Sequence, residues 1–149
     1  MFFMKRHESL APLSREHHGA LLLARLLQKG APVYKGLPSD IAGKAAYAIQ
    51  FYHDELIPHF AAEEKIVLQR IKGISDKLDI LSEQIIREHI KLRLLFDRIP
   101  DAGQLDDHLD SLGLALEKHI RKEERELFPL IQDTCNESIL AGILQSFTA

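Results

Sequence analysis

The sequence of 149 residues has no tryptophan, one cysteine, two valines and two threonines. Because valine and threonine stiffen χ1 and favour strands, the scarcity of these two residues beside 24 leucines predicts an all-α fold. The single cysteine, Cys135, has no partner for an internal disulfide or for a thiolate metal site, so we interpret it as a structural or incidental thiol. A chain of this length suffices for one ordinary domain, and we expect residues 1–149 to form it.

The sequence also lacks a long apolar run and an excess of positive charge. No apolar stretch reaches the roughly 18 residues that a membrane span needs, and the opening residues are too few for the apolar core of a signal peptide. We therefore expect a cytoplasmic protein without a membrane partner. The formal net charge of -3 and the pI near 6.2 leave no basic footprint for a phosphate backbone, which argues against nucleic acid as a partner.

Start and stop signals divide the chain into four long helices and one short one. The first follows Pro12 and Ser14 and runs to Lys29, where Gly30 ends it. The others have N-terminal signals at Ser39-Asp40, Ser75-Asp76, Leu105 and Asn136-Glu137, and they end near 72, before Pro100, after Pro129 and near 147. Short connections predict an up-down-up-down four-helix bundle over about 10–131, with the C-terminal helix at about 136–147 across one end.

Each long helix has an apolar stripe at three- and four-residue spacing, and polar side chains interrupt every stripe. The predicted inward residues are Leu13, His17, Ala20, Ala24 and Leu27; Ile49, Tyr52, Leu56, His59, Glu63 and Ile66; Leu78, Leu81, Ile85, His89, Leu92 and Phe96; and Leu105, Leu109, Leu112, Leu116, His119, Glu123, Leu127 and Leu130. Burial of an imidazole or carboxylate without a partner costs several kcal/mol. The interrupting groups therefore require a shared partner.

The interrupting residues belong to an internal repeat. Arg15-Glu16-His17 recurs as Arg87-Glu88-His89, and the His-x-x-x-Glu-Glu segment at 59–64 recurs at 119–124. A separation of four residues places two side chains on one helix face about 6 Å apart along the axis, so the histidine can bind one metal while the glutamate reaches a second. The pattern predicts a dinuclear metal site made of His17, His59, Glu63, His89, His119 and Glu123.

The ligand set indicates the metal. Two histidines per metal and two bridging glutamates give each metal four protein donors, and an oxide or hydroxide bridge leaves one position open. Imidazole and carboxylate ligands without thiolate suit iron, with manganese or zinc as alternatives. Two iron ions in an apolar bundle favour a small diatomic ligand, dioxygen or nitric oxide.

The remaining histidines carry weaker signals. His18 neighbours His17 within a leucine-rich segment that blurs the stripe, so either residue is a candidate for the ligand on the first helix. His53 and His108 fall off the inward faces, and His7 precedes the first helix. We expect His53 and His108 at the surface or at an edge, and His7 carries no signal.

Four further residues lie near the predicted ligands in the sequence, and each has a structural or a functional interpretation. Glu64 and Glu124 lie about 100° around the helix from the preceding glutamates, within charged runs, and we expect them on solvated faces. Tyr52 either packs in the core or lines the pocket, and packing is the favoured reading. Pro58 removes a backbone hydrogen bond and predicts a distortion beside His59 that aims this ligand.

The constellation resembles the hemerythrin-like, or HHE cation-binding, family over about Leu10 to Ile131. The resemblance implies a four-helix bundle with ligands at His17, His59, Glu63, His89, His119 and Glu123. The oxygen-carrying hemerythrins have a second histidine four residues after the third-helix one, where this chain has Arg93. The resulting symmetric site is similar to that of the iron-centre repair proteins of nitrosative stress, although this sequence shows no counterpart of their N-terminal cysteine-bearing segment.

Two functions follow from this interpretation. The leading one is a non-haem di-iron protein that binds, senses or detoxifies dioxygen, nitric oxide or peroxide. The other is an iron-responsive or structural metal-binding module, without redox turnover, that docks to a protein partner. A ferritin-like oxidase would show Glu-x-x-His, and none of the 8 histidines has a glutamate three residues before it.

Overall fold

The computed structural model describes residues 5–148, and every regular element within this range is a helix. The first long stretch is α1 (Ala11–Leu27), and the second comprises α2 (Ile41–Phe51), η1 (Tyr52–Leu56), α3 (Ile57–Ala62), η2 (Glu63–Val67) and α4 (Leu68–Arg70). The third is α5 (Asp76–Asp97), followed by the short turn η3 (Ile99–Asp101). The fourth comprises α6 (Leu105–Lys122), η4 (Glu123–Leu127) and α7 (Phe128–Thr134), and α8 (Glu137–Thr148) comes last. The all-α prediction is confirmed.

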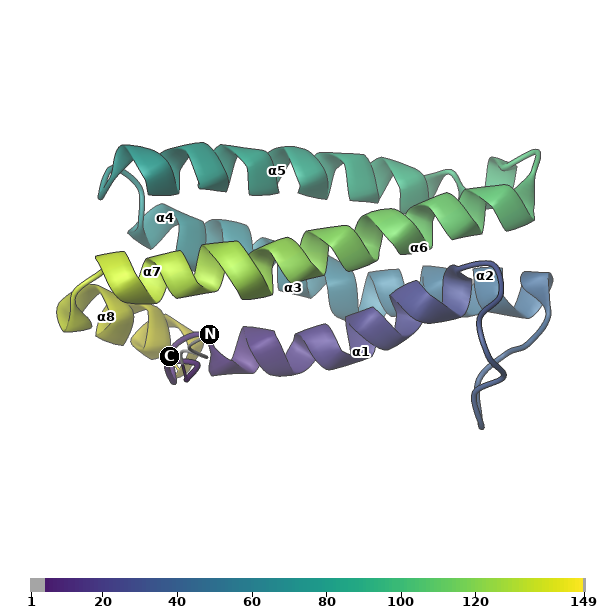
Figure 1. Ribbon diagram of the computed structural model, residues 1–149, viewed down its shortest axis with the longest axis horizontal. Helices are drawn as coiled ribbons and strands as arrows, with labels where there is room; N and C mark the ends of the chain where they lie inside the picture. Colours follow the sequence, from purple (N-terminus) through teal and green to yellow (C-terminus); the bar gives the residue numbers. More distant parts are fainter. Residues whose placement is uncertain (1–4, 149) are drawn as a thin grey trace.

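The four long stretches lie side by side along the long axis of the molecule, and α8 lies at one end (Figure 1). Leu140 and Ile143 of α8 are buried there, in a hydrophobic cluster that includes Leu68 of α4 and Ile131 of α7. The C-terminal helix therefore covers one end of a helical bundle, as predicted.

Most of the predicted start and stop signals are confirmed. The side chains of Asp40, Ser75 and Asn136 each accept a hydrogen bond from the backbone N–H three residues later, at 3.0 to 3.1 Å. Gly30 and Gly73 have φ of +77° and +79°, the left-handed conformation that ends a helix.

The start of the first helix was predicted too late. Helix α1 begins at Ala11, so Pro12 and Ser14 lie inside its first turn and not before it. Proline suits that turn because its φ is already helical and because the first amide groups of a helix have no intrahelical acceptor.

Three π turns interrupt the second and fourth stretches. The first, η1, directly precedes Ile57-Pro58, so the distortion that Pro58 predicted is present as a π turn. The other two, η2 and η4, begin at Glu63 and Glu123, whose carbonyl oxygens accept from the N–H five residues later. A π turn inserts an extra residue and rotates everything beyond it, and such turns occur frequently at functional sites.

The π turns account for two of the four positions where the predicted stripes fail. In α1 and α5, which contain no π turn, every predicted inward residue is buried. In the other two stretches Ile49, Ile66, Leu105 and Leu130 are only half-buried. Leu127 is buried as predicted, whereas Val67 is buried in place of Ile66 and Ile131 in place of Leu130. Each of these two shifts is one residue, as expected from the residue that a π turn inserts.

Two hydrophobic clusters fill the bundle. One contains Tyr52, Phe60 and Phe96, and the other contains Phe128 and the residues that contact α8. Tyr52 stacks on Phe96 with ring centres 4.6 Å apart, which supports the core-packing interpretation of this tyrosine. Cys135 is buried in the second cluster, just beyond the end of α7, in keeping with a structural thiol.

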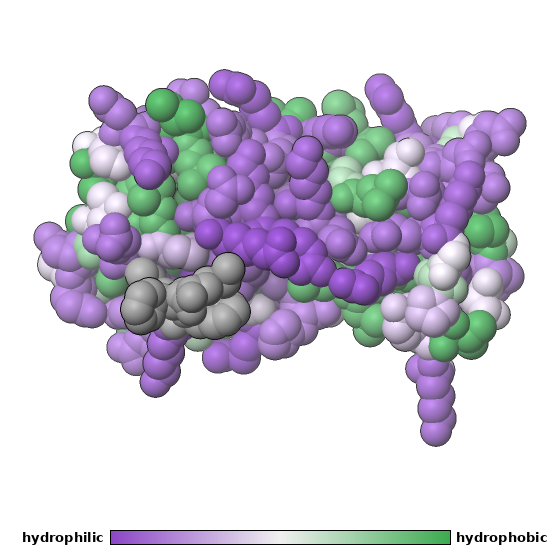
Figure 2. Space-filling view, viewed as in Figure 1, coloured by the Kyte–Doolittle hydropathy of each residue, from purple (hydrophilic) through white to green (hydrophobic). Residues whose placement is uncertain are grey.

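The surface of the bundle is hydrophilic over the middle of the face shown in Figure 2, and hydrophobic side chains gather towards its two ends. Helix α5 carries four exposed ones, namely Ile80, Ile86, Ile90 and Leu94. Within residues 5–148 no helix is both long and apolar enough to cross a membrane.

Close packing of α1 against α6 generates a first prediction. A Cβ added at Gly113 would lie 2.5 Å from the backbone oxygen of Ala24 and 3.1 Å from Cβ of Leu27. Gly113→Ala gains about 1 kcal/mol of helix propensity but forces two backbones apart at a cost of about 1–3 kcal/mol. We expect a net loss of stability of about 1 kcal/mol, measured by chemical denaturation.

The matched control is Gly19→Ala in α1. Its Cβ would make an ordinary contact of 3.4 Å with the ring of Phe51, so this variant should be neutral or stabilised by up to about 1 kcal/mol. Equal stabilisation of both variants would contradict the close approach of α1 and α6.

Candidate metal centre

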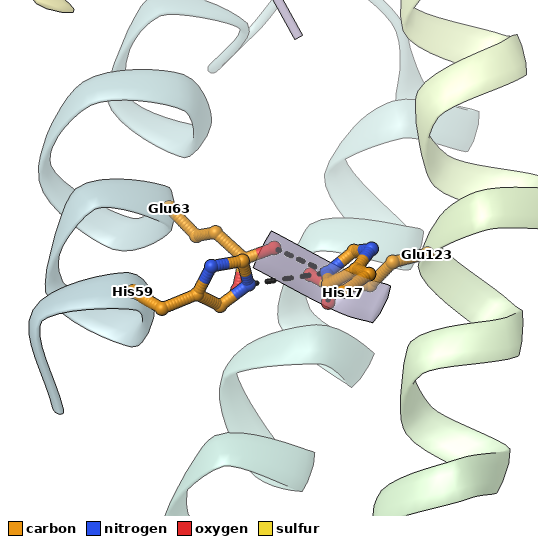
Figure 3. Close-up of side chains that lie close together, drawn as sticks. All are labelled: His17, His59, Glu63 and Glu123. Carbon is orange, nitrogen blue, oxygen red and sulfur yellow. Dashed lines mark hydrogen bonds and ion pairs between the residues drawn. The ribbon is translucent and has the colours of Figure 1, made fainter. Parts of the chain in front are cut away.

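Six buried polar side chains converge between the two hydrophobic clusters. They are the six predicted ligands, with exposed fractions of 0 to 4%: His17 on α1, His59 on α3, Glu63 at the start of η2, His89 on α5, His119 on α6 and Glu123 at the start of η4. Figure 3 shows four of them pointing towards one another. All six predicted positions thus meet in one place.

The other histidines lie away from this place. His18 is exposed on the outer side of α1, so it is His17 that faces the core. His53 is exposed, and His108 is half-buried and donates from Nε2 to the carbonyl oxygen of Leu95 at 2.7 Å. His7 contacts Ser9 and Glu137 near the first helix.

The six side chains form two groups that share both glutamates. The first is His17, His59, Glu63 and Glu123, the second is Glu63, His89, His119 and Glu123, and within each the potential ligand atoms lie within 4.8 Å of one another. Oε1 of Glu63 lies 3.3 Å from Nε2 of His59 and 3.2 Å from Nε2 of His89. Glu123 lies in the same way between the other two histidines, with Oε1 at 3.2 Å from each Nε2. Each carboxylate therefore lies between the two groups.

Each histidine is held from behind by a second carboxylate. The Nδ1 atoms lie 2.6 to 2.7 Å from an outer glutamate oxygen, in the pairs His17 with Glu124, His59 with Glu16, His89 with Glu64, and His119 with Glu88. Because a carboxylate only accepts, the ring must donate its Nδ1–H. In a neutral imidazole this leaves the Nε2 lone pair directed at the centre.

The outer glutamates correct one prediction and add two residues. Glu64 and Glu124 were expected on solvated faces, yet both are half-buried against a histidine of the neighbouring helix. A position 100° from the core face of a helix faces its neighbour in a bundle, and here that neighbour presents an Nδ1–H. Glu16 and Glu88 were assigned no role, although both lie in the repeated Arg-Glu-His.

The chemistry of the inner atoms fits a pair of cations. Both oxygens of Glu63 and of Glu123, together with Nε2 of His89 and of His119, are buried without a hydrogen-bond partner. Nε2 of His17 and Nε2 of His59 face each other at 3.1 Å. A metal with bonds of about 2.0–2.1 Å holds neighbouring ligand atoms about 2.9–3.4 Å apart, which matches these spacings. A buried cluster made of acceptors alone requires cations or added protons.

A family model of the hemerythrin HHE cation binding domain matches residues 9–131. The chain belongs to the hemerythrin HHE family. The resemblance inferred from the spacing of histidines and glutamates is thereby confirmed, over nearly the same range. No curated protein and no solved structure matches this chain.

Cations support three of the four outer glutamates of this HHE domain. Glu64 lies 3.0 Å from Arg93, Glu88 lies 3.0 Å from Lys122, and Glu124 lies 3.3 Å from Arg6. The hydrogen bond from His89 holds the pKa of Glu64 below its ordinary value, and Arg93 acts in the same direction. The fourth outer glutamate, Glu16, is half-exposed and pairs with no lysine or arginine in the described part of the chain.

The buried imidazoles of the HHE centre bind protons strongly when no metal is present. Burial lowers their pKa values, but hydrogen bonds and charges from the neighbouring glutamates outweigh it. The pKa rises to about 9 for His17, about 11 for His59 and about 10 for His119, and that of His89 is raised as well. Protons on Nε2 then occupy the direction in which a metal would bind, so metal and protons compete.

This competition generates a second prediction, for the metal-free protein. A histidine whose pKa in the folded state lies above its unfolded value of 6.5 stabilises the fold, and this contribution is complete below pH 6.5. This stability is lost as the pH rises through the folded values of about 9 to 11. We expect the free energy of unfolding of the metal-free protein to fall from about pH 7 to about pH 10, measured by denaturant titration.

The metal-loaded protein is the control, because its imidazoles exchange no proton in this range. Its stability should change much less between the same two pH values. A metal-free protein whose stability is constant or increases over this range would contradict the protonated cluster.

Proposed function

We propose that this protein binds two iron ions in the HHE centre and uses them to bind, sense or detoxify dioxygen, nitric oxide or peroxide. In this proposal the ligands of one ion are His17 and His59, those of the other are His89 and His119, and Glu63 and Glu123 bridge the two. The observation that supports it most is the set of buried acceptor atoms with no hydrogen-bond partner, which belong to two groups whose potential ligand atoms lie within 4.8 Å of one another. We propose that the four long helical stretches that carry these residues form the up-down-up-down bundle expected from their short connections.

The choice of iron rests on the kind of ligand atoms. The centre offers imidazole nitrogen and carboxylate oxygen, and its six residues include no thiolate. Two bound irons would supply one-electron redox chemistry and open coordination positions to a small ligand. The chain holds the imidazoles in a fixed tautomer through the outer glutamates and keeps bulk water out with the flanking hydrophobic clusters.

Deep burial favours a second candidate, a structural or iron-responsive module without turnover. Three surface cavities of about 290 to 460 Å³ are lined by residues other than the six. A metal at the shared centre of four helical stretches would stabilise the bundle even without a substrate, because binding to the folded state alone adds stability. The binding and turnover experiments below separate the two candidates.

The third prediction concerns metal content. Protein purified from iron-replete cells should contain two irons per chain and show an absorption spectrum that changes on exposure to air or nitric oxide. Zinc or no metal in place of iron would refute the di-iron proposal. Two irons with a large rise in melting temperature but no spectral response or peroxide turnover would favour the structural module.

The fourth prediction concerns the individual ligands and uses neighbouring residues as controls. His17→Ala removes an inward imidazole, whereas His18→Ala removes an exposed one from the next position. Glu123→Ala removes a bridging carboxylate, whereas Glu126→Ala removes an exposed one. We expect the first variant of each pair to lose at least one iron per chain, measured by elemental analysis, and the second to retain both.

Equal iron content in the members of either pair would contradict the assigned ligand. Circular dichroism of the metal-free variants shows whether the bundle is intact. Any loss of metal is interpreted only for variants that keep their helical signal.

A further inference from the structure

Two arginines outside the six-residue centre make the same two contacts at different places in the bundle. Arg93 lies 3.0 Å from Glu64, the carboxylate that accepts from Nδ1 of His89 at 2.6 Å. The same guanidinium lies over the ring of Phe60, 5.5 Å from its centre. Phe60 in turn stacks on His89, with ring centres 4.3 Å apart and 24° between the planes. Arg93 is therefore connected to His89 twice, through Glu64 at the edge of the imidazole ring and through Phe60 at its face.

Arg6 makes the corresponding contacts to His17. Its Nη2 lies 3.3 Å from Oε1 of Glu124 and donates to the backbone oxygen of the same residue at 3.0 Å. Its guanidinium carbon lies 5.4 Å from the ring centre of Phe128, and Phe128 stacks on His17 at 5.6 Å with 8° between the planes. Glu124 accepts from Nδ1 of His17 at 2.7 Å. The edge and the face of this imidazole are again both connected to one arginine.

Two contacts determine the orientation of an imidazole more fully than one. The hydrogen bond at Nδ1 sets the direction of the ring edge, and the stacked phenyl ring sets the plane. A planar guanidinium can hydrogen-bond a carboxylate with its edge while its face rests on an aromatic ring, which a lysine ammonium cannot do. Each arginine thus ties together the two groups that hold one histidine.

The other two histidines are held differently. Glu16, behind His59, pairs with no cation among residues 5–148, and Glu88, behind His119, pairs with Lys122. Phe60 meets these two histidines only edge-on, with interplanar angles of 64° and 89°. The arginine-supported histidines therefore fall one in each group of potential ligands: His17 in the first and His89 in the second.

We propose that Arg6 and Arg93 are positioning residues, one for each metal position of the centre. This inference rests on the proposed function, because it assumes that both positions bind metal. Arg6 fixes the Nε2 direction of His17, and Arg93 fixes that of His89. Since Arg6 precedes α1, a residue ahead of the helical bundle helps to position the centre.

The fifth prediction tests the two arginines with Arg6→Ala, Arg93→Ala and the double variant. Arg87→Ala is the matched control, because Arg87 lies on α5 as well and its ion pair with Glu83 is exposed on both sides. Metal-free full-length protein is titrated with Co²⁺, whose visible spectrum reports on ligand geometry. The wild type and Arg87→Ala should bind two ions. Each single variant should bind one ion as before and the other about 10–100-fold more weakly, the usual effect of removing an outer partner.

The double variant should weaken both ions and change the Co²⁺ spectrum at both positions. Arg6→Lys and Arg93→Lys keep the charge without the planar group, so they should recover less than half of the lost affinity on a logarithmic scale. They also keep the test valid where an alanine variant folds poorly. Melting curves of the metal-free variants test for a purely structural role, which would lower their melting temperatures below that of Arg87→Ala. A positioning role predicts that the melting temperatures match that of Arg87→Ala.

The outcomes distinguish this inference from the proposed function. A wild-type protein that binds fewer than two ions refutes the dinuclear centre itself. Two tight ions in the wild type, with alanine variants that match Arg87→Ala in affinity and spectrum, refute the positioning role and leave the centre intact. Full recovery by the lysine variants also refutes it, because charge alone would then account for the effect.

Discussion

The rest of the structure depends on a concentration of hydrogen-bond acceptors at the centre of the bundle. Four imidazoles and two carboxylates are buried there with their acceptor atoms 3.1 to 3.9 Å apart. Such a cluster is stable only if cations, or protons in their place, occupy the space between the atoms. The raised pKa values of the histidines and the family's cation binding are two consequences of this one constraint.

The outer glutamates extend this constraint to the whole bundle, because each holds a histidine on the next long stretch. Glu16 of α1 holds His59, Glu64 of η2 holds His89, Glu88 of α5 holds His119, and Glu124 of η4 holds His17 and closes the ring. No stretch completes the centre alone, so displacement of one helix disturbs the histidine of the next. The two hydrophobic clusters hold the four stretches together on either side of this polar layer.

Prediction from the sequence succeeded throughout the two uninterrupted long helices and failed at single positions of the two interrupted stretches. In α1 and α5 the 3.6-residue period placed every inward residue correctly, His17 and His89 included. In the other stretches Leu127 is buried as predicted, but Val67 and Ile131 are buried in place of Ile66 and Leu130. A π turn begins at Glu63 and at Glu123 and shifts these positions by one residue. A helical wheel also represents one helix at a time. It located the inner histidines and glutamates on the core face, but it did not show that Glu64 would face the Nδ1–H of a neighbouring helix.

The arginine contacts could not be predicted from the sequence repeat, because the repeat does not relate the residues that make them. Repeat equivalence pairs His17 with His89 and Glu124 with Glu64, yet the residue that corresponds to Arg93 is Leu21, not Arg6. Likewise, the repeat pairs Phe60 with Ile120 and Phe128 with Leu68. The same chain of guanidinium, phenyl ring and imidazole is therefore built twice from residues that the repeat does not relate. A geometry that recurs on non-equivalent residues indicates a requirement of the centre and not a remnant of duplication. A buried imidazole that must present one nitrogen to a cation needs both its edge and its plane fixed.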